Sequence, residues 1–410
     1  MDVNVGTGAP TVPKDVAELI TELEHEVSQN YARPYVKRDA HPKTHGCVQA
    51  VLTVNSNLGK DLRVGVFEPD GHTTYRAWVR FSNAFQIQHD VEWETRGIAI
   101  KLLGLKVGGE LLEPDAVSGT HDFLCATHSA FFLADRDVAL YKAFAIAAAT
   151  APRKVLGFFL RHGRFRGLWA LLRGSGWFGK PVLNPLALTY YSQTPYKFGD
   201  HEVVKLRLRP TTEGVSPRVH RRLWWYLKIV LANLILMFFA KGPRKSLLES
   251  WVDKYIAAHN FLRTNMTTFL ATRPATFDVQ VQFRRDGMPP EEDPTLPWSE
   301  RQSQFRSVAT LTIPRQVFWP APGMPKSILD ATKEMMALGE HMSFDPWHAI
   351  AAHEPRGGIN LARRWIYKAL SNYRHQQNGI DVAMRNDPDT LIPTIEQYDR
   401  LADHVQFGRV

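Results

Sequence analysis

The amino-acid sequence predicts an α+β protein, and two patterns lead to this fold class. Alternating apolar and polar residues, which are typical of half-buried strands, recur at 48–54, 95–101, 203–208, 276–283 and 308–314. Apolar residues at helical spacing occur at 14–30 and again at 325–340. The 410 residues, 44% of them hydrophobic and 22% charged, are enough to bury the large core that such a fold needs.

The first strongly periodic segment lies in an N-terminal arm, residues 1–34. Val16, Leu19 and Leu23 lie on one face of a predicted helix at 14–30, with acidic residues between them. We expect this surface helix to pack on a β-barrel formed by the predicted strands or on a second subunit. A homo-oligomer is therefore compatible with the sequence.

The cysteine content indicates a reducing compartment. Cys47 and Cys125 are the two cysteines, which is too few for a disulfide framework. The first residues, 1–4, lack the basic and then apolar regions of a signal peptide. We therefore expect a cytoplasmic protein.

Two histidines, His41 and His45, precede the predicted strand at 48–54. A neutral imidazole can take a proton from a peroxide and return it to the leaving oxygen. A histidine beside a strand is more often structural, so position alone does not give either residue a chemical role. After this strand, residues 62–83 are predicted to form two further strands joined by a turn at 69–71.

The middle of the chain is strongly basic. Residues 136–260 hold 21 Lys or Arg against 6 Asp or Glu, whereas the whole chain has a formal net charge of +9. Arginines alternate with aromatic residues at 158–169, a pattern compatible with nucleic acid but explained equally well by lipid contact. The plain alternative is a solvated basic surface. Of the anionic partners, we expect lipid rather than nucleic acid.

An apolar run follows at 229–240, inside a segment at 221–245 whose ends are basic. It is shorter than the roughly 20 residues that a spanning helix needs. A helix lying at the inner face of a membrane, or lining the entrance for a long apolar substrate, fits this pattern. A buried core helix fits it as well.

The stretch with the most distinctive chemistry begins at Arg363. Arg363 and Tyr367 stand four residues apart, so they share one face of a helix, and Arg374 lies two turns further along roughly that face. A guanidinium beside a phenol favours the phenolate, and haem iron is one of the few partners that calls for such a ligand. The alternative is an Arg–Tyr pair on an ordinary basic helix.

These residues, with Phe344-Asp345-Pro346 before them, resemble the proximal haem segment of the catalase family. The resemblance extends over roughly 35–135 and 295–380. It implies an antiparallel β-barrel that holds haem b, covered by helices, within a haem domain at 35–410 that carries the basic apolar insertion at about 136–260. It further implies that Tyr367 is the proximal iron ligand, that Arg363 tunes it and that Arg374 meets a propionate.

Three further motifs follow the catalase order. Arg38, His41, Lys43 and Gly46 match the distal motif, which implies His41 as the distal acid and base and Arg38 as a propionate contact. Thr44 stands where the family has Gly, and His45 remains an alternative distal histidine.

Arg80-Phe81-Ser82 matches the family segment in which the arginine meets a propionate and the serine orients the distal histidine. Phe131 and Phe132 align with a Phe-Phe pair near the haem. This alignment puts Thr127 where the family has a catalytic Asn, and a hydroxyl polarises a peroxide less than an amide does.

The resemblance therefore favours the compact catalase-related enzymes, some of which act on fatty-acid hydroperoxides as allene oxide synthases do. We expect cleavage of the O–O bond of a lipid or other organic hydroperoxide at a tyrosinate-ligated haem. The alternatives are a peroxidase or weak catalase that uses hydrogen peroxide, and a non-catalytic haem- or lipid-binding protein at a membrane surface.

Overall fold

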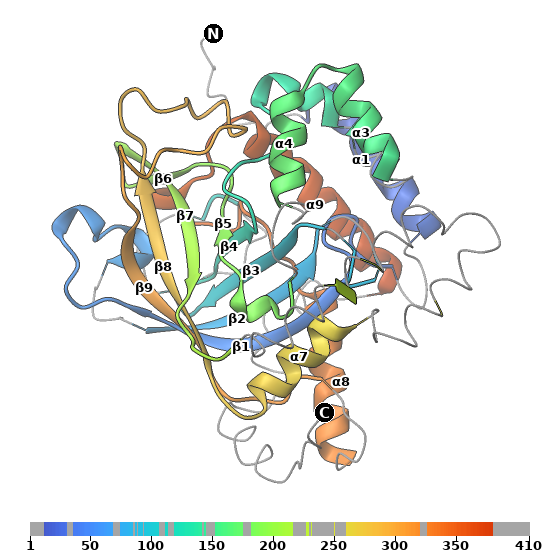
Figure 1. The fold of residues 1–410 in the computed structure, drawn as a ribbon, viewed down its shortest axis with the longest axis vertical. Helices are drawn as coiled ribbons and strands as arrows, with labels where there is room; N and C mark the ends of the chain where they lie inside the picture. Colours follow the sequence, from blue (N-terminus) through green and yellow to red (C-terminus); the bar gives the residue numbers. More distant parts are fainter. Residues whose placement is uncertain are drawn as a thin grey trace.

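In the part of the chain that the structure describes, nine antiparallel strands form the centre of the protein, which is seen in a computed structural model (Figure 1). The structure describes residues 12–30, 36–68, 74–84, 87, 89–92, 94–105, 111–113, 119–141, 143–144, 152–174, 182–215, 227–228, 231, 250, 260–319 and 326–379. The strands are β1 (Thr44–Val54), β2 (Thr74–Asn83), β3 (Arg96–Leu103), β4 (His121–Ala126), β5 (Tyr190–Tyr191), β6 (Tyr196–Phe198), β7 (Glu202–Pro210), β8 (Ala275–Phe283) and β9 (Arg306–Ile313).

The sheet closes on itself. Its order is β5-β4-β3-β2-β1-β9-β8-β7-β6, and β5 also pairs with β7, so eight strands form a ring and β6 extends it on β7. Closure leaves the eight strands of the ring without the exposed edges of an open sheet. The predicted α+β fold with an antiparallel barrel is confirmed.

The alternation of β1 shows why this sequence builds a barrel. Val48, Ala50 and Leu52 are buried in the main core, whereas Gln49 and Thr53 point away from it. A fully buried Leu or Val stabilises the fold by roughly 1.5–3 kcal/mol relative to an exposed one. A shift of the strand by one residue would expose this whole set, so the pattern fixes the register.

Helices cover the barrel on two sides (Figure 1). They are α1 (Lys14–Asn30), α3 (Pro152–Arg161), α4 (Phe165–Gly174), α7 (Phe261–Leu270), α8 (Lys326–His341) and α9 (Gly358–Asn378). The chain also forms short 3-10 turns, η1 (Lys60–Leu62), η2 (Gly65–Phe67), η3 (Asp135–Leu140), η4 (Pro185–Ala187) and η5 (Ala351–His353). Helices α7 and α8 pack on β1, whereas α1 packs on α9.

The predicted helix at 14–30 is α1, and its apolar face contacts α9 within this chain. Val16, Leu19 and Leu23 form a buried cluster with Ala362 and Ile366 of α9. Helix α9 ends at Gly379, whose φ of 63° is the left-handed conformation that commonly ends a helix. This pairing holds α9 between the barrel and the N-terminal arm.

Two expectations need correction. Residues 62–67 form no strand, because Gly65 has a φ of 56° and the chain turns there through η1 and η2. Residues 136–260 do not form one insertion, because β5, β6 and β7 lie within this range and belong to the sheet.

Some expectations lie outside the described residues. These are the turn at 69–71 and nearly all of the apolar segment at 221–245, of which only Leu227, Lys228 and Leu231 are described. Among the helices that the structure describes, none combines the length and apolar character needed to cross a membrane.

Candidate functional site

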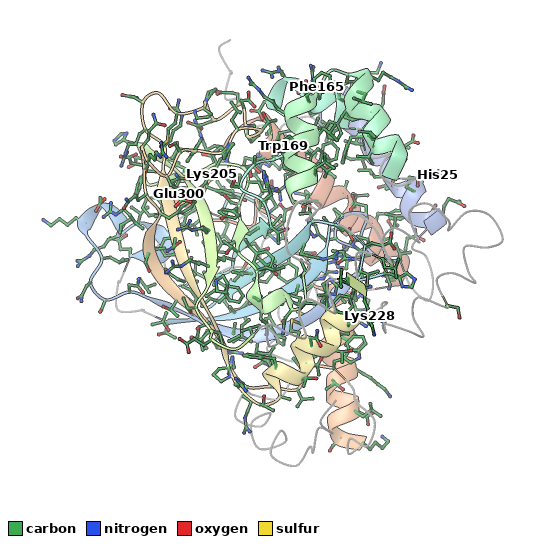
Figure 2. All side chains as sticks on the ribbon, in the orientation of Figure 1. His25, Phe165, Trp169, Lys205, Lys228 and Glu300 are labelled. Carbon is green, nitrogen blue, oxygen red and sulfur yellow. The ribbon has the colours of Figure 1, made fainter. Side chains whose placement is uncertain are left out.

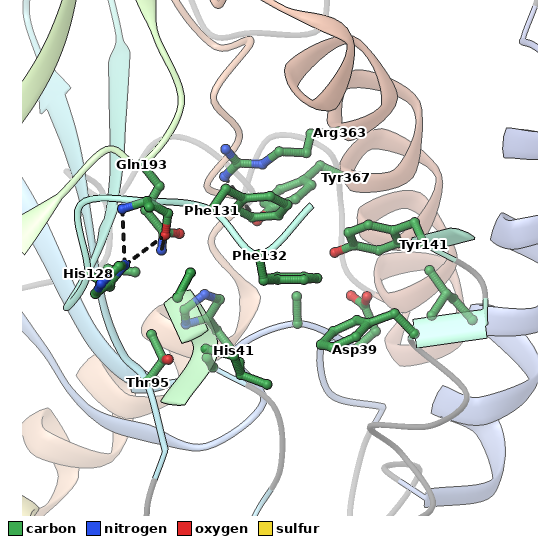
Figure 3. A pocket seen from close by; sticks show the side chains of 18 of the residues that line it. Asp39, His41, Thr95, His128, Phe131, Phe132, Tyr141, Gln193, Arg363 and Tyr367 are labelled. Carbon is green, nitrogen blue, oxygen red and sulfur yellow. Dashed lines mark hydrogen bonds between the residues drawn. The ribbon is translucent and has the colours of Figure 1, made fainter. Parts of the chain in front are cut away.

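A hollow lies between the barrel and α9 (Figure 3). It consists of two adjoining cavities, with volumes of about 150 Å³ and 90 Å³. Both are much larger than the space that one buried water needs, roughly 10–15 Å³. The residues that line both cavities are Asp39, Ala40, His41, Ala126, Gln193, Arg363 and Tyr367. The hollow is therefore continuous from His41 to Tyr367.

His41 is held in place from three sides. Its backbone N–H donates to the carbonyl of Ala84, and its own carbonyl accepts a bond from Arg80, both at 2.9 Å. Its ring Nδ1 lies 2.9 Å from the hydroxyl oxygen of Ser82. Its φ of 59° is unusual for a residue with a side chain, and such a conformation persists only where the surroundings impose it.

The His41 ring is neutral at ordinary pH. Burial, which is the largest cause, and the positive charges of Arg80, Arg363 and Arg38 together lower its pKa to about 3. Because Nδ1 is engaged with Ser82, Nε2 is the nitrogen left for a ligand in the hollow. A neutral imidazole with one free nitrogen can accept a proton and return it.

His45 lies elsewhere. It is fully buried, its Nε2 lies 2.6 Å from the amide oxygen of Asn83, and its Nδ1 lies 3.8 Å from the carboxylate of Asp90. It lines neither cavity. Of the two histidines that the sequence left as alternatives, the structure brings His41 to the hollow.

Tyr367 and Arg363 lie one turn apart on α9. Arg363 donates a hydrogen bond to the Tyr367 hydroxyl at 3.3 Å and another to the Asn360 side-chain oxygen at 3.1 Å. Burial alone would lower the pKa of Arg363, but the neighbouring phenols of Tyr367 and Tyr196 raise it above its ordinary value. The guanidinium is thus a permanent positive charge beside the phenol oxygen.

Three arginines converge on the second cavity. Arg38, Arg80 and Arg374 all line it and all are buried. Arg80 lies 3.8 Å from the carboxylate of Glu340. Burial lowers the pKa of Arg38 well below its ordinary value, and the charges of Arg80 and Arg374 add to this shift. The Nε atoms of Arg38 and Arg80 are buried and have no hydrogen-bond partner among the described residues, which is costly unless an anion binds them.

The first cavity has an apolar end. The rings of Phe131 and Phe132 stack at 4.3 Å between centroids, and Phe144 lies 4.1 Å from Phe132. Leu23 and Val27 of α1 and Leu171 of α4 line the same cavity. We predicted no chemical role for α1, because its apolar stripe is typical of an ordinary surface helix.

The expected polar residue Thr127 is not in the lining of either cavity. Its hydroxyl accepts a hydrogen bond from the backbone N–H of Arg96 at 3.1 Å. Gln193 lines the hollow instead, with a φ of 62°, and its amide donates to the carbonyl of Ala130 at 3.0 Å. His128 accepts from the N–H of Ala130 at 3.1 Å (Figure 3). Neither residue carries a sequence signal that would single it out.

The structure brings most of the predicted site residues to one hollow. Those that line it are Arg38, His41, Arg80, Ser82, Phe131, Phe132, Arg363, Tyr367 and Arg374. They come from regions more than 200 residues apart in the chain, joined by the closure of the barrel and by α9.

Comparison with known proteins identifies the architecture. No family model and no curated protein sequence matches the chain. Among solved structures, a bacterial catalase is similar with a TM-score of 0.59 and 16% identity, over 100% of this chain and 70% of that chain. A fungal catalase has a TM-score of 0.57 and 14% identity, over 94% and 68% of the two chains.

Catalase A from Saccharomyces cerevisiae is similar with a TM-score of 0.55 and 15% identity, over 100% of this chain and 81% of that chain. The protein has a catalase-like fold. At these identities the similarity establishes the barrel and its covering helices.

Proposed function

We propose that the protein is a haem-dependent enzyme that breaks the O–O bond of an organic hydroperoxide. One observation carries this proposal: His41, Tyr367 and Arg363 line a single hollow inside a catalase-like barrel. One bound group would therefore contact a proton carrier, His41, and an anionic oxygen ligand, Tyr367. The Arg363 cation would favour the anionic form of this ligand.

The lining fits haem b. The Tyr367 oxygen, beside the Arg363 guanidinium at 3.3 Å, is suited to an iron ligand in phenolate form. Arg38, Arg80 and Arg374 are suited to two propionates by charge-assisted bonds. The buried Nε atoms of Arg38 and Arg80 are donors for which the described residues provide no acceptor.

Bound haem would supply the electrons that break the O–O bond. The protein's own residues would contribute to this step by moving one proton. The Nε2 atom of neutral His41 would accept the proton of the terminal hydroperoxide oxygen. It would then donate this proton to the alkoxy oxygen, which leaves as the alcohol. The contact with Ser82 at 2.9 Å fixes the ring for both transfers. Arg80 donates a hydrogen bond to the backbone carbonyl of His41.

The apolar end of the first cavity favours an organic substrate. Phe131, Phe132, Phe144 and Leu171 would surround an alkyl chain whose hydroperoxide group reaches His41. A fatty-acid hydroperoxide has this form, and its carboxylate would suit the basic surplus of the chain. Hydrogen peroxide is the second candidate substrate, favoured by the similarity of the fold to catalases.

Substrate preference is tested with purified haem-loaded protein. Initial rates of consumption of a polyunsaturated fatty-acid hydroperoxide and of hydrogen peroxide are compared at equal concentration, with oxygen release recorded. A preference for the lipid supports the proposal, and product analysis then separates a rearrangement from a reduction. A preference for hydrogen peroxide makes the protein a peroxidase or catalase. A rate no higher than that of free haem would indicate a non-catalytic haem-binding protein.

The ligand assignment has a matched test on one helix. Tyr367 and Tyr373 both lie on α9, but only Tyr367 lines the hollow. We expect Tyr367→Phe to change the visible absorption spectrum of the haem and to abolish turnover, while Tyr373→Phe keeps both. An unchanged spectrum in Tyr367→Phe would remove this tyrosine as ligand.

A further inference from the structure

We propose that the outer face of helices α3 and α4 docks on a membrane of anionic phospholipid, beside the apolar end of the hollow. We name it the α3–α4 face and define it by Leu156, Leu160, Phe165 and Trp169. These side chains are 46%, 54%, 63% and 52% exposed, respectively. Docking itself does not depend on the proposed function, whereas passage of a lipid hydroperoxide from the membrane to His41 does.

The exposed apolar residues are concentrated on this face. In the described part of the chain, nine large hydrophobic residues are exposed, and four of them fall within the fourteen residues from Leu156 to Trp169. Leu156 and Leu160 are four residues apart on α3, and Phe165 and Trp169 are four apart on α4, so each pair shares one helix face. Figure 2 shows Phe165 and Trp169 on α4.

The charged residues in the sequence of these two helices all have one sign. Residues 152–174 contain six Lys or Arg and no Asp or Glu. Arg161 and Arg166 are exposed between the apolar side chains. Phosphate headgroups complement such charges, while the leucines and aromatic rings enter the acyl boundary. Leu156 and Leu160 offer no stacking surface to a base, which favours lipid over nucleic acid.

The opposite faces of the two helices are firmly packed. Phe158 and Phe159 are buried and contact Phe144 at 5.7 and 5.9 Å between ring centroids. Gly167 allows the close approach of α4, because a Cβ there would lie 2.1 Å from the carbonyl oxygen of Phe132. The docking face is therefore part of the fixed structure.

An ion pair ties the turn between these two helices to the main body. Arg164 donates from Nε to the carboxylate of Asp137 at 2.8 Å, and Asp137 is buried. This pair holds the start of α4, the helix that carries Phe165 and Trp169. Because both helices are anchored on their inner side, their exposed apolar side chains are presented outward rather than folded back.

Helix α4 also forms a wall of the hollow. Ala170 and Leu171 line the first cavity, whereas Trp169, the residue before them, is on the exposed face. Phe132, against which Gly167 packs, lines the same cavity. A membrane bound on the α3–α4 face would thus be separated from the cavity by one helix, a short path for an apolar substrate.

Vesicle flotation of the haem-loaded full chain tests the proposal. Vesicles of phosphatidylcholine with phosphatidylglycerol are compared with phosphatidylcholine alone, at low and high salt. We expect flotation with the anionic vesicles, weakened by salt because exposed charges are screened. Absence of flotation with anionic vesicles at low salt would overturn the proposal. Equal flotation with both lipids would overturn the role of the basic residues.

Two double variants and a control locate the surface. Phe165→Ser with Trp169→Ser, and separately Arg161→Glu with Arg166→Glu, are each expected to lower the bound fraction about tenfold. All four side chains are exposed, so folding, checked by circular dichroism, should persist. Leu361→Ser removes a leucine that is 47% exposed on α9 and should float like the parent protein.

Further outcomes separate this proposal from its rivals. Equal flotation of the Phe165/Trp169 variant and the parent protein would exclude the α3–α4 face. Self-association in sedimentation, lost in the same variant and without flotation, would replace the membrane by a second copy of the chain. Because flotation needs no turnover, a failure of the proposed hydroperoxide chemistry leaves this test unchanged.

Discussion

Gly97 lies directly against the imidazole of His41. A Cβ atom added to Gly97 would be 2.3 Å from Cε1 and 2.4 Å from Nδ1 of this ring, much closer than carbon and nitrogen atoms approach without a bond. Strand β3, which carries Gly97, therefore packs directly against the ring of His41. This residue is glycine because the ring occupies the space of a side chain.

Gly97→Ala should displace His41 while leaving the proposed haem-binding residues of α9 in place. We expect kcat to fall by about 100-fold, because a general acid and base displaced by about 1 Å loses most of its effect. The haem spectrum should change little. Gly157→Ala is the matched control, since nothing lies within 4 Å of its added Cβ. Full activity in Gly97→Ala would mean that His41 takes no part in turnover.

Ser82→Ala should have a smaller effect than loss of the histidine itself. Ser82 acts on His41 through one hydrogen bond of 2.9 Å, and such a bond contributes about 1 kcal/mol, or roughly a fivefold change in rate. His41→Ala should cost about 100- to 10,000-fold. Ser343→Ala serves as the control, because Ser343 lines the same cavity but bonds to Ser371. Equal losses of rate in Ser82→Ala and Ser343→Ala would contradict the orienting role of Ser82.

The pH dependence of kcat/KM follows from the lowered pKa of His41. Burial and the charges of Arg80, Arg363 and Arg38 bring this pKa to about 3, so the ring stays neutral far below the usual range of histidine. We expect kcat/KM to be flat from about pH 8 down to about pH 5. Haem retention must be recorded at each pH by absorbance. A tenfold loss per unit beginning near pH 6.5, with haem retained, would contradict the assignment.

Much of the fold could be predicted from local sequence patterns. The strands β1, β7, β8 and β9 show the alternation of a half-buried surface, and the apolar stripe of α1 has helical spacing. The 3-10 turns within 60–67 could not be predicted because Val64-Gly65-Val66-Phe67 is apolar and contains two β-branched valines, as a strand does. Its conformation depends on long-range contacts, among them the bond from the Val66 N–H to His353 at 3.2 Å.

The candidate site could be predicted only where residue chemistry is distinctive. The pair Arg363 and Tyr367 stands out because its spacing and its chemistry point to the same role. The sequence left His41 and His45 as alternatives, since both precede the predicted strand at 48–54. Their places in the fold separate them, because His45 is buried within β1 whereas His41 lines the hollow. The place of Gln193 in the hollow could not be predicted, because it depends on a positive φ that glutamine rarely adopts.

His353 should make the stability of the protein depend on pH. This ring is 2% exposed, among Phe67, Phe123 and Phe198, and burial lowers its pKa to about 4. In the unfolded chain a histidine titrates near 6.5, so between about pH 6.5 and 4 the unfolded state binds a proton that the folded state does not. The free energy of unfolding therefore falls as pH falls, by about 1.4 kcal/mol per pH unit from this residue.

His353→Gln removes this titration and isolates it from that of other groups. The Gln side-chain oxygen can still accept from the Val66 N–H, so the variant loses stability by an amount that does not vary with pH. Between pH 7 and 5 the parent protein should lose about 2 kcal/mol more than the variant, since only about 1.5 units of this interval lie below pH 6.5. Urea unfolding at both pH values measures the difference. Parallel losses in the two proteins would mean that His353 accepts a proton in the folded state.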